Sequence, residues 1–350
     1  MTSPIEKIIN RQQAITEGTF DFQEVNVPKY STYAVCNLRG GVGKTTLTFN
    51  LSYYASDVLV VDVCPQGNLS YFFDKDYDKR NPNAYDMLLP YLVPGLGPAN
   101  HVAAYVGATN SSFDGRKTYY IPSSNEFYLA PSALNSALNL TQNLPAKNRA
   151  DGIARVLFSL KKEIEREKKE LGLAKTLIDT SPFFSGGTEL AWHASEGLIV
   201  PIRTDRQSIN SFELLIRTLT DPSLGFLRYR EQVEGFRIPK IHAVVLTHCG
   251  WSTKKDARSV PNQQTKIYLQ QCYDILSRNR SLLSSDVPED HLFLLDDLLG
   301  SGRVSSLKSR PIELLKSGEA AYYERVRAYV NQSVEKCKQE LRFINALLWN

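Results

Sequence analysis

The residues best suited to chemistry lie between Tyr33 and Thr46, in the segment YAVCNLRGGVGKTT. An apolar run predicts a buried strand, three glycines predict a turn, and the residues after Lys44 predict a helix. Glycines let backbone N–H groups point at phosphate oxygens, and a helix N-terminus adds partial positive charge. We therefore predict a nucleotide-binding phosphate loop formed by Gly40, Gly41, Val42, Gly43, Lys44, Thr45 and Thr46, in which Lys44 contacts the terminal phosphates and the Thr45 hydroxyl binds Mg²⁺.

Two aspartates are suited to completing the magnesium site. Asp62 ends a β-branched run at residues 57–62, and Asp179 ends an apolar run at residues 176–179. A helix between two short strands indicates parallel pairing, which brings the C-terminal ends of neighbouring strands together beside the phosphate loop. We expect Thr45, Asp62 and Asp179 to bind Mg²⁺. For Asp179 taken alone, a helix N-cap is an alternative interpretation.

Four segments in this order resemble one family. The common phosphate loop G-x-x-x-x-G-K-[ST] requires glycine at position 38, where Leu38 stands. The crowded glycines instead resemble the deviant Walker A loop, KGGxGKT, of the ParA/MinD family of ATPases. Residues 62–68, DVCPQGN, resemble the family's D-x-D-P-Q-G-N. Residues 176–182 resemble its hhhDtpP pattern, and residues 197–202 resemble its vliPv strand.

The resemblance covers roughly residues 31–330 and is closest to the ParA-type partition ATPases. It implies an α/β fold: a doubly wound, mostly parallel twisted sheet with helices on both faces. It also implies Mg²⁺-dependent ATP hydrolysis and an ATP-dependent homodimer. In that family the first lysine of the loop crosses the dimer interface to the partner's nucleotide, and Arg39 takes its place here. The resemblance therefore suggests Lys44, Asp62 and Arg39 as catalytic residues.

Cys64 departs from the family pattern, because the second aspartate of D-x-D-P-Q-G-N stands there in the family and helps to orient the attacking water. A thiol is a poor group for positioning water unless it is deprotonated. We therefore expect slow hydrolysis and a long-lived ATP state. The alternative is that another residue takes this role, and Asp62 is the nearest candidate.

The composition is that of an ordinary globular protein. The 350 residues are 42% hydrophobic and 22% charged, with a net charge of +4. No apolar run is long enough to span a membrane, the N-terminus lacks the apolar core of a signal peptide, and five scattered cysteines form no CxxC pair. We expect a cytoplasmic protein, with residues 1–30 as an N-terminal arm and residues 31–350 as a single ATPase domain.

The expected partners follow from basic residues in the C-terminal half. In DNA-partitioning members of the family such residues bind DNA without sequence preference, through phosphate charge. The resemblance thus suggests non-specific DNA, nucleoid association and a ParB-like centromere-binding activator. The basic residues form two groups, Lys254, Lys255, Arg258, Lys266, Arg278 and Arg280, and then Arg303, Lys308, Arg310 and Lys316.

Two other uses of the same switch stay open. The apolar spacing of residues 323–348 predicts one long amphipathic helix, which either packs on the core or binds a membrane surface as in a MinD-like regulator. Its polar face lacks the basic bias that membrane binding favours, so a membrane partner is the weaker hypothesis. The third use is an ATP-holding assembly or regulatory protein with little hydrolysis.

The remaining patterns predict further elements. We expect a helix around residues 5–15, a short strand at 127–129, one helix over 153–171, and strands at 241–247 and 291–295. His193, His242 and His248 show no metal-ligand spacing, and core or surface positions are the expectation for them.

Overall fold

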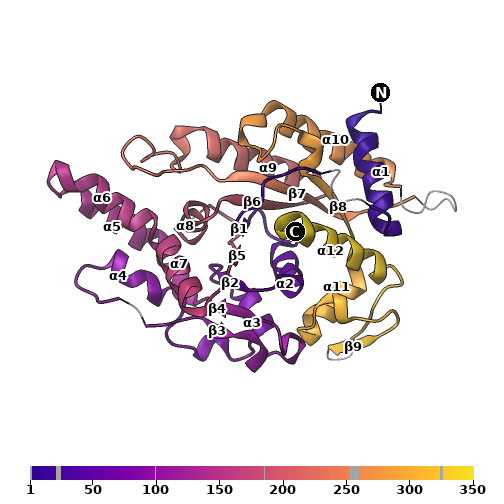
Figure 1. Ribbon diagram of the computed structural model, residues 1–350, viewed down its shortest axis with the longest axis horizontal. Helices are drawn as coiled ribbons and strands as arrows, with labels where there is room; N and C mark the ends of the chain where they lie inside the picture. Colours follow the sequence, from indigo (N-terminus) through magenta and orange to yellow (C-terminus); the bar gives the residue numbers. More distant parts are fainter. Residues whose placement is uncertain (1, 21–24, 99, 185, 253–259, 324–325) are drawn as a thin grey trace.

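The centre of the computed structural model is an eight-stranded sheet with the strand order β3-β4-β2-β5-β1-β6-β7-β8 (Figure 1). The model describes residues 2–20, 25–98, 100–184, 186–252, 260–323 and 326–350. All pairs in this sheet are parallel except β3 with β4. The predicted doubly wound α/β fold is confirmed. The strands are β1 (Thr32–Val35), β2 (Val58–Asp62), β3 (Ala104–Tyr105), β4 (Thr118–Ile121), β5 (Lys175–Asp179), β6 (Gly197–Arg203), β7 (Lys240–Cys249) and β8 (Leu292–Asp296).

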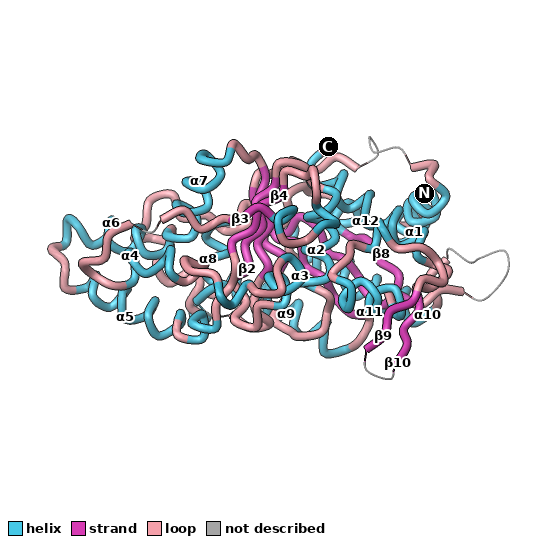
Figure 2. Tube along the Cα trace, turned by 90° about the horizontal axis from the view of Figure 1, so that it is seen from below, coloured by secondary structure: helices cyan, strands magenta, loops and turns pink. Residues whose placement is uncertain are grey.

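Two layers of helices cover the two faces of the sheet (Figures 1 and 2). Every residue of β1 and β2 is buried, as expected for strands packed on both sides. One layer contains α2 (Lys44–Tyr54), α3 (Asn68–Phe73), α11 (Leu299–Lys308) and α12 (Val334–Trp349). The other contains α4 (Leu89–Leu92), α5 (Ala130–Gln142), α6 (Ala146–Leu157), α7 (Ser159–Leu171), α8 (Gly186–Ala194), α9 (Arg206–Thr220) and α10 (Gln263–Arg278).

The N-terminal segment forms the predicted helix, α1 (Pro4–Glu17). Ser3 and Glu6 make a reciprocal capping box at its start, and Pro4 occupies the first turn, where a missing N–H costs nothing. The helix packs against α12 and β8 at the β8 edge of the sheet. The Gln12 side-chain amide donates a hydrogen bond of 2.6 Å to the buried carboxylate of Glu340 in α12.

Two predicted elements differ from the structure. Residues 125–128 form a 3-10 helix capped by the Ser124 hydroxyl, and the strand of this region is β4, a few residues earlier. The expected helix over 153–171 is two helices, α6 and α7, which meet at Phe158. The apolar positions keep a 3–4 spacing across Phe158, so periodicity alone does not reveal a break of one residue.

The predicted long terminal helix is wrong in its first part. Residues 320–323 and 326–329 form two antiparallel strands, β9 (Ala320–Tyr323) and β10 (Val326–Tyr329), and α12 begins only at Val334. Valine, alanine and tyrosine in this stretch suit a hairpin as well as a helix, and the spacing did not separate the two. The apolar face of α12 packs on α2 and β8, as in the interpretation of a helix laid against the core. Within the described residues, no helix combines the length and apolar character needed to cross a bilayer.

Candidate nucleotide-binding site

The phosphate loop connects the buried end of β1 to the first turn of α2. Gly41 and Gly43 have φ of +73° and +93°, a left-handed conformation that side chains disfavour, so glycine is required at both positions. The turn leaves α2 without a side-chain cap, and its first N–H groups are available to an anion. The Lys44 ammonium is buried and donates a hydrogen bond of 2.9 Å to the carbonyl oxygen of Arg39, across the loop.

The two aspartates lie side by side at the C-terminal ends of β2 and β5, where Asp62 and Asp179 are register partners. The Thr45 hydroxyl donates to Asp179 at 2.7 Å, and the Thr48 hydroxyl lies 3.3 Å from the other carboxylate oxygen. The N-cap interpretation of Asp179 is wrong, because the next helix, α8, begins only at Gly186.

Asp62 is hydrogen-bonded to the start of α3. Its carboxylate accepts hydrogen bonds from the backbone N–H groups of Cys64 (3.0 Å) and Ser70 (2.9 Å) and from the Ser70 hydroxyl (2.8 Å). Ser70 is a residue that the motif did not reveal. Both oxygens of Asp62 are therefore already hydrogen-bonded within the protein, whereas Asp179 is the carboxylate in direct contact with Thr45.

Burial dominates the electrostatics of this carboxylate pair. It raises the pKa of Asp179 to about 7, with a further contribution from the negative charge of Asp62, and it raises the pKa of Asp62 to about 6. Burial also lowers the pKa of Lys44, which Asp179 opposes. A hydroxyl and two carboxylates form an all-oxygen donor set, the kind that Mg²⁺ prefers. The residues present therefore fit a magnesium ion.

A pH-dependent stability test follows for Asp179. Its folded pKa of about 7 exceeds the ordinary value of 3.8, so this group favours folding below pH 3.8 and loses that contribution as the pH rises through 7. Without Mg²⁺ or nucleotide, Asp179→Asn should be more stable than wild type at pH 8. This advantage should be about 1 kcal/mol smaller at pH 6. Urea unfolding at the two pH values measures it, and an unchanged difference would contradict the assignment.

Cys64 is buried beside the two aspartates, with 6% of its surface exposed. Burial and the charge of Asp62 raise the pKa of its thiol to about 12, so the side chain is neutral at physiological pH. The Cys64 carbonyl accepts a hydrogen bond of 2.6 Å from the Ser123 hydroxyl, which fixes the backbone here. A neutral, buried thiol neither orients water as a carboxylate does nor reacts readily with oxidants.

Arg39 is bound within its own chain. Its guanidinium forms an ion pair with Asp205 and donates to the Ser208 hydroxyl at 2.7 Å. Asp205 is also the N-cap of α9, where it accepts a hydrogen bond from the Ser208 N–H at 2.9 Å. About 29% of the Arg39 side chain is exposed, so it lies at the surface of the site. The expected contact with a partner's nucleotide requires the ion pair with Asp205 to open.

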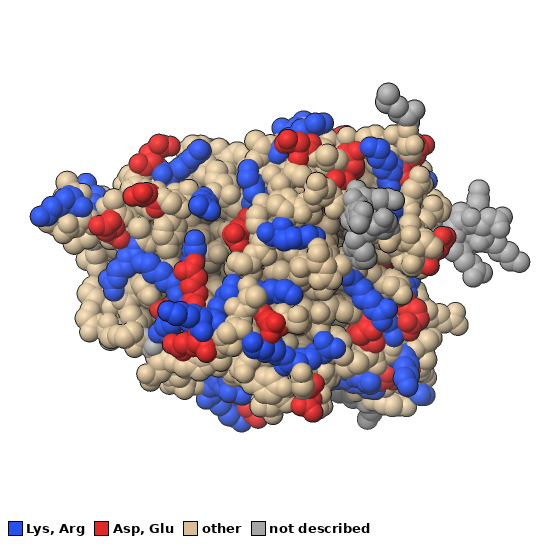
Figure 3. Space-filling model, in the orientation of Figure 1, with Lys and Arg blue, Asp and Glu red and all other residues tan. Residues whose placement is uncertain are grey.

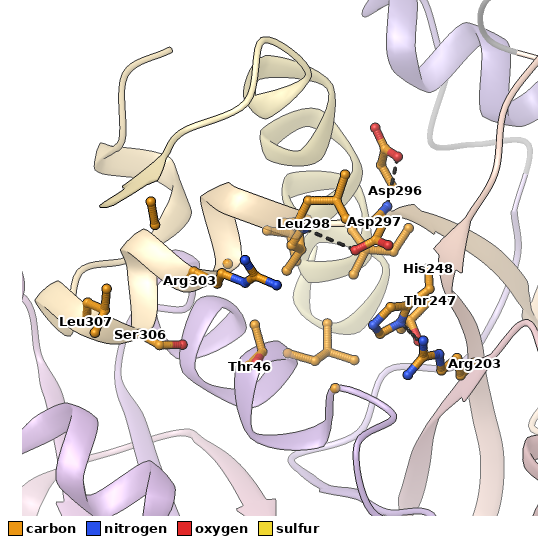
Figure 4. A pocket seen from close by; sticks show the side chains of 17 residues that line it. Thr46, Arg203, Thr247, His248, Asp296, Asp297, Leu298, Arg303, Ser306 and Leu307 are labelled. Atoms are coloured by element: carbon orange, nitrogen blue, oxygen red, sulfur yellow. Dashed lines mark hydrogen bonds between the residues drawn. The ribbon is translucent and has the colours of Figure 1, made fainter. Parts of the chain in front are cut away.

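A cavity of about 740 Å³ opens next to the phosphate loop, at the C-terminal ends of β6, β7 and β8 (Figure 4). Gly43, Thr46 and Leu47 form one wall, and α11, α12 and β10 form the opposite one. Many lining residues are apolar, which suits a flat base, and the volume is that of an ordinary small-molecule pocket. Arg203, Asp296 and Asp297 line this cavity and were not singled out from the sequence. His248 and Arg303 also line it, although the sequence suggested other roles for them.

His248 and Arg303 lie on opposite sides of this cavity. In Figure 4, Arg303 extends from α11 toward the centre of the cavity, and His248 with Arg203 lies on the other side. His248 has a φ of +58°, a conformation uncommon for a residue other than glycine and typical of constrained functional positions. The sequence offered no spacing signal for this histidine, and the default expectation of a core or surface role missed its position in the cavity.

Comparisons with known proteins agree with this geometry. A family model described as an AAA domain matches residues 30–223, more than half of the chain. The chain belongs to this family. It is a P-loop ATPase of the ParA/MinD type, as its loop resemblance predicted.

Two curated relatives of this ATPase are named as chromosome partitioning proteins. The chain is 26% identical over 206 residues to the chromosome partitioning protein ParA of two strains of Caulobacter vibrioides. The match covers 58% of this chain and 66% of each relative, slightly less than two thirds of the relatives' length.

Solved structures share the fold at low sequence identity. The ATP complex of an McdA variant from Cyanothece gives a TM-score of 0.59 at 17% identity, and the match covers 91% of this chain and 97% of that one. A putative plasmid partition protein from Borrelia burgdorferi B31 bound to AMPPNP gives a TM-score of 0.50 at 14% identity, with 91% and 98% covered.

Those basic residues of the two predicted groups that the structure describes do not gather into one patch. Lys254, Lys255 and Arg258 lie outside the described residues. Arg278 and Arg280 are exposed at the end of α10, whereas the second group lies around α11, in the opposite helix layer (Figure 1). There, Lys308 and Arg310 both pair with Glu319. On the face shown in Figure 3, acidic side chains are interspersed among the basic ones.

Proposed function

We propose that the protein is an ATP-dependent dimerising switch of the ParA type, which acts in plasmid or chromosome partition with slow ATP hydrolysis. The observation that carries this proposal is the contact between Thr45 and Asp179 at the end of a glycine loop, next to a cavity of nucleotide size. The family and the names of the Caulobacter relatives support the same function.

In this proposal the backbone of Gly40–Gly43 and the Lys44 ammonium bind the phosphates of ATP, and Thr45, Asp62 and Asp179 hold Mg²⁺. The ion, when bound, offsets the charge of the phosphates and of the two buried carboxylates. The base lies in the cavity between α2 and α11. Lys44 exchanges its hydrogen bond to the Arg39 carbonyl for a phosphate oxygen, which frees the backbone at Arg39.

The proposed switch depends on the thermodynamic coupling between nucleotide binding and dimerisation. A ligand that binds the closed dimer better than the monomer shifts the population toward the dimer by its difference in affinity. Arg39 contributes this difference in affinity in our proposal. It lies at the surface of the site, and in the dimer it exchanges its ion pair with Asp205 of its own chain for the partner's nucleotide. Hydrolysis or release of nucleotide then returns Arg39 to Asp205 and reopens the dimer.

Non-specific DNA is the proposed partner surface, with a ParB-like activator to stimulate hydrolysis. Arg278, Arg280 and Lys316 are exposed and available to phosphates. Each phosphate neutralised by a protein cation releases a counterion, so such binding weakens steeply as salt rises. Arg303 is less suited to this role, because it points into the cavity.

Binding to a duplex of arbitrary sequence tests the DNA proposal. We expect binding with ATP and Mg²⁺, much weaker binding with ADP or without nucleotide, and affinity that falls linearly on logarithmic salt axes. The double variant Arg278→Ala with Arg280→Ala should reduce the salt slope by about 2 if both residues contact phosphates. Lys147→Ala with Lys162→Ala, which removes two exposed charges elsewhere, is the matched control. Equal binding in all nucleotide states would contradict the proposal.

A second candidate is an assembly or regulatory protein that holds ATP with little hydrolysis. The neutral thiol of Cys64 beside the magnesium ligands favours it. Stoichiometric bound ATP with turnover near zero, even with DNA and partner present, would select this function. The membrane-regulator alternative has less support, since the apolar side of α12 is packed inside the protein.

A further inference from the structure

A second cavity, of about 560 Å³, lies at the end of the sheet opposite the phosphate loop. It is lined by the residues that lead into β1 and β6 and the first residue of β7, together with side chains of α7 and the end of α8. The parallel strands β1, β6 and β7 begin beside this cavity and end at the nucleotide site. Nothing in the proposed ATPase cycle uses it.

The lining of this cavity is strongly cationic. Five lysine or arginine side chains face two carboxylates, Glu165 and Glu196. Glu196 is already engaged, because it accepts hydrogen bonds from the Ser31 N–H and hydroxyl, both at 2.9 Å. The five cationic residues are Lys161, Lys168, Arg230, Arg237 and Lys240.

Three of these cations have no hydrogen-bond or ion-pair partner in the part of the chain that the structure describes. They are Lys161, Lys168 and Arg237. Lys168 is half-buried, and burial lowers the pKa of its ammonium group, an effect that the charges of Glu196 and Glu165 oppose. Lys161 and Arg237 are exposed, and cations with spare N–H donors gain free energy when an anion binds between them.

His193 lines the same cavity and is an independent sign of a missing ligand. Only 6% of its surface is exposed, and neither ring nitrogen has a hydrogen-bond partner among the described residues. Its ring stacks on Phe226, with centroids 4.8 Å apart, and meets the edge of Phe236 at 5.1 Å. Burial lowers its pKa to about 3, so the ring is neutral and offers one donor and one acceptor. Buried polar groups are rarely left unsatisfied.

We propose that this cavity binds a nucleoside monophosphate or a closely similar molecule, with one phosphate group and one planar ring. The phosphate contacts Lys161, Lys168 and Arg237. The ring lies among Phe158, Phe236 and Tyr30, which also line the cavity, and its polar edge exchanges hydrogen bonds with His193. The volume of the cavity is ample for such a ligand.

Calorimetric titration of the full chain tests the proposal. The Lys44→Ala background weakens nucleotide binding at the phosphate loop, and AMP, GMP, UMP, adenosine and inorganic phosphate are the probes. We expect at least one nucleotide to bind, and to bind more tightly than both adenosine and inorganic phosphate. Lys161→Gln with Lys168→Gln should weaken that binding about tenfold or more. Lys162→Gln with Lys169→Gln is the matched control, because these exposed lysines of α7 lie outside the cavity.

His193→Phe separates the ring contact from the charge contact. It keeps a buried aromatic side chain but removes both nitrogens, so it should weaken nucleotide binding and leave phosphate binding unchanged. The proposal is overturned if no nucleotide binds, if phosphate binds as tightly as every nucleotide, or if the control pair weakens binding equally. These outcomes do not depend on the ATPase proposal. That proposal would be contradicted by a different result, namely that the wild-type chain does not bind ATP.

Discussion

The variant Cys64→Asp should hydrolyse ATP about 100-fold faster than the wild-type chain in a single turnover, since a positioning group commonly contributes a factor of this size. A carboxylate at position 64 accepts a hydrogen bond from water, which the neutral thiol of Cys64 cannot do as effectively. The new group would lie beside Asp62 and Asp179, so Mg²⁺ should be present to offset the added charge. Rapid-quench measurement of phosphate release with protein in excess over ATP gives the rate.

Two further variants make this result specific. Cys64→Ser has nearly the same size and no charge, so its rate should stay within a few-fold of wild type. Asp62→Asn tests whether Asp62 already positions the water, although three hydrogen bonds from Ser70 and Cys64 already occupy its oxygens. If wild type and Cys64→Asp hydrolyse bound ATP at the same rate, the slow-turnover hypothesis is wrong.

The second large effect concerns the ion pair between Arg39 and Asp205. We expect Arg39→Ala to weaken the ATP-dependent dimer about 10- to 100-fold, the range expected for losing hydrogen bonds between a charged group and phosphate. Asp205→Asn should preserve or strengthen the dimer. It frees Arg39, and asparagine caps a helix about as well as aspartate, so α9 keeps its N-cap. Analytical ultracentrifugation with ATP and Mg²⁺ measures both dimer affinities.

The pair of variants distinguishes two roles for Arg39. If the arginine reaches the partner's nucleotide, the two substitutions change the dimer affinity in opposite directions. If it only holds the start of α9, removing either partner breaks the same contact, so both substitutions change the dimer affinity alike. The second result would reject the contact across the interface.

The part of the site that the sequence predicts well is local or follows from parallel pairing. Gly41, Gly43 and Lys44 are contiguous, and their chemistry depends on a single turn. Asp62 and Asp179 are far apart along the chain, but both end strands of one parallel sheet, so their proximity follows from topology. The parallel sheet with helices on both faces was predictable for the same reason.

The parts that were missed depend on contacts between distant segments. Asp205 lies 166 residues from Arg39, and no local pattern links them. The orientation of Asp62 toward Ser70 depends on how α3 packs, which periodicity does not describe. Periodicity also failed at residues 320–329, where the same apolar spacing suits a hairpin and a helix.

The walls of the cavity beside the phosphate loop come from two parts of the chain, one inside the family match and one beyond it. The family match ends at residue 223, whereas most lining residues of the cavity, from Thr247 to Leu341, lie beyond it. In the proposed complex, the matched part would handle triphosphate and metal, and the later part would decide which nucleobase fits. Substitutions at Arg303 or Leu298 should therefore change which nucleobase binds more than they change metal binding at Thr45 and Asp179.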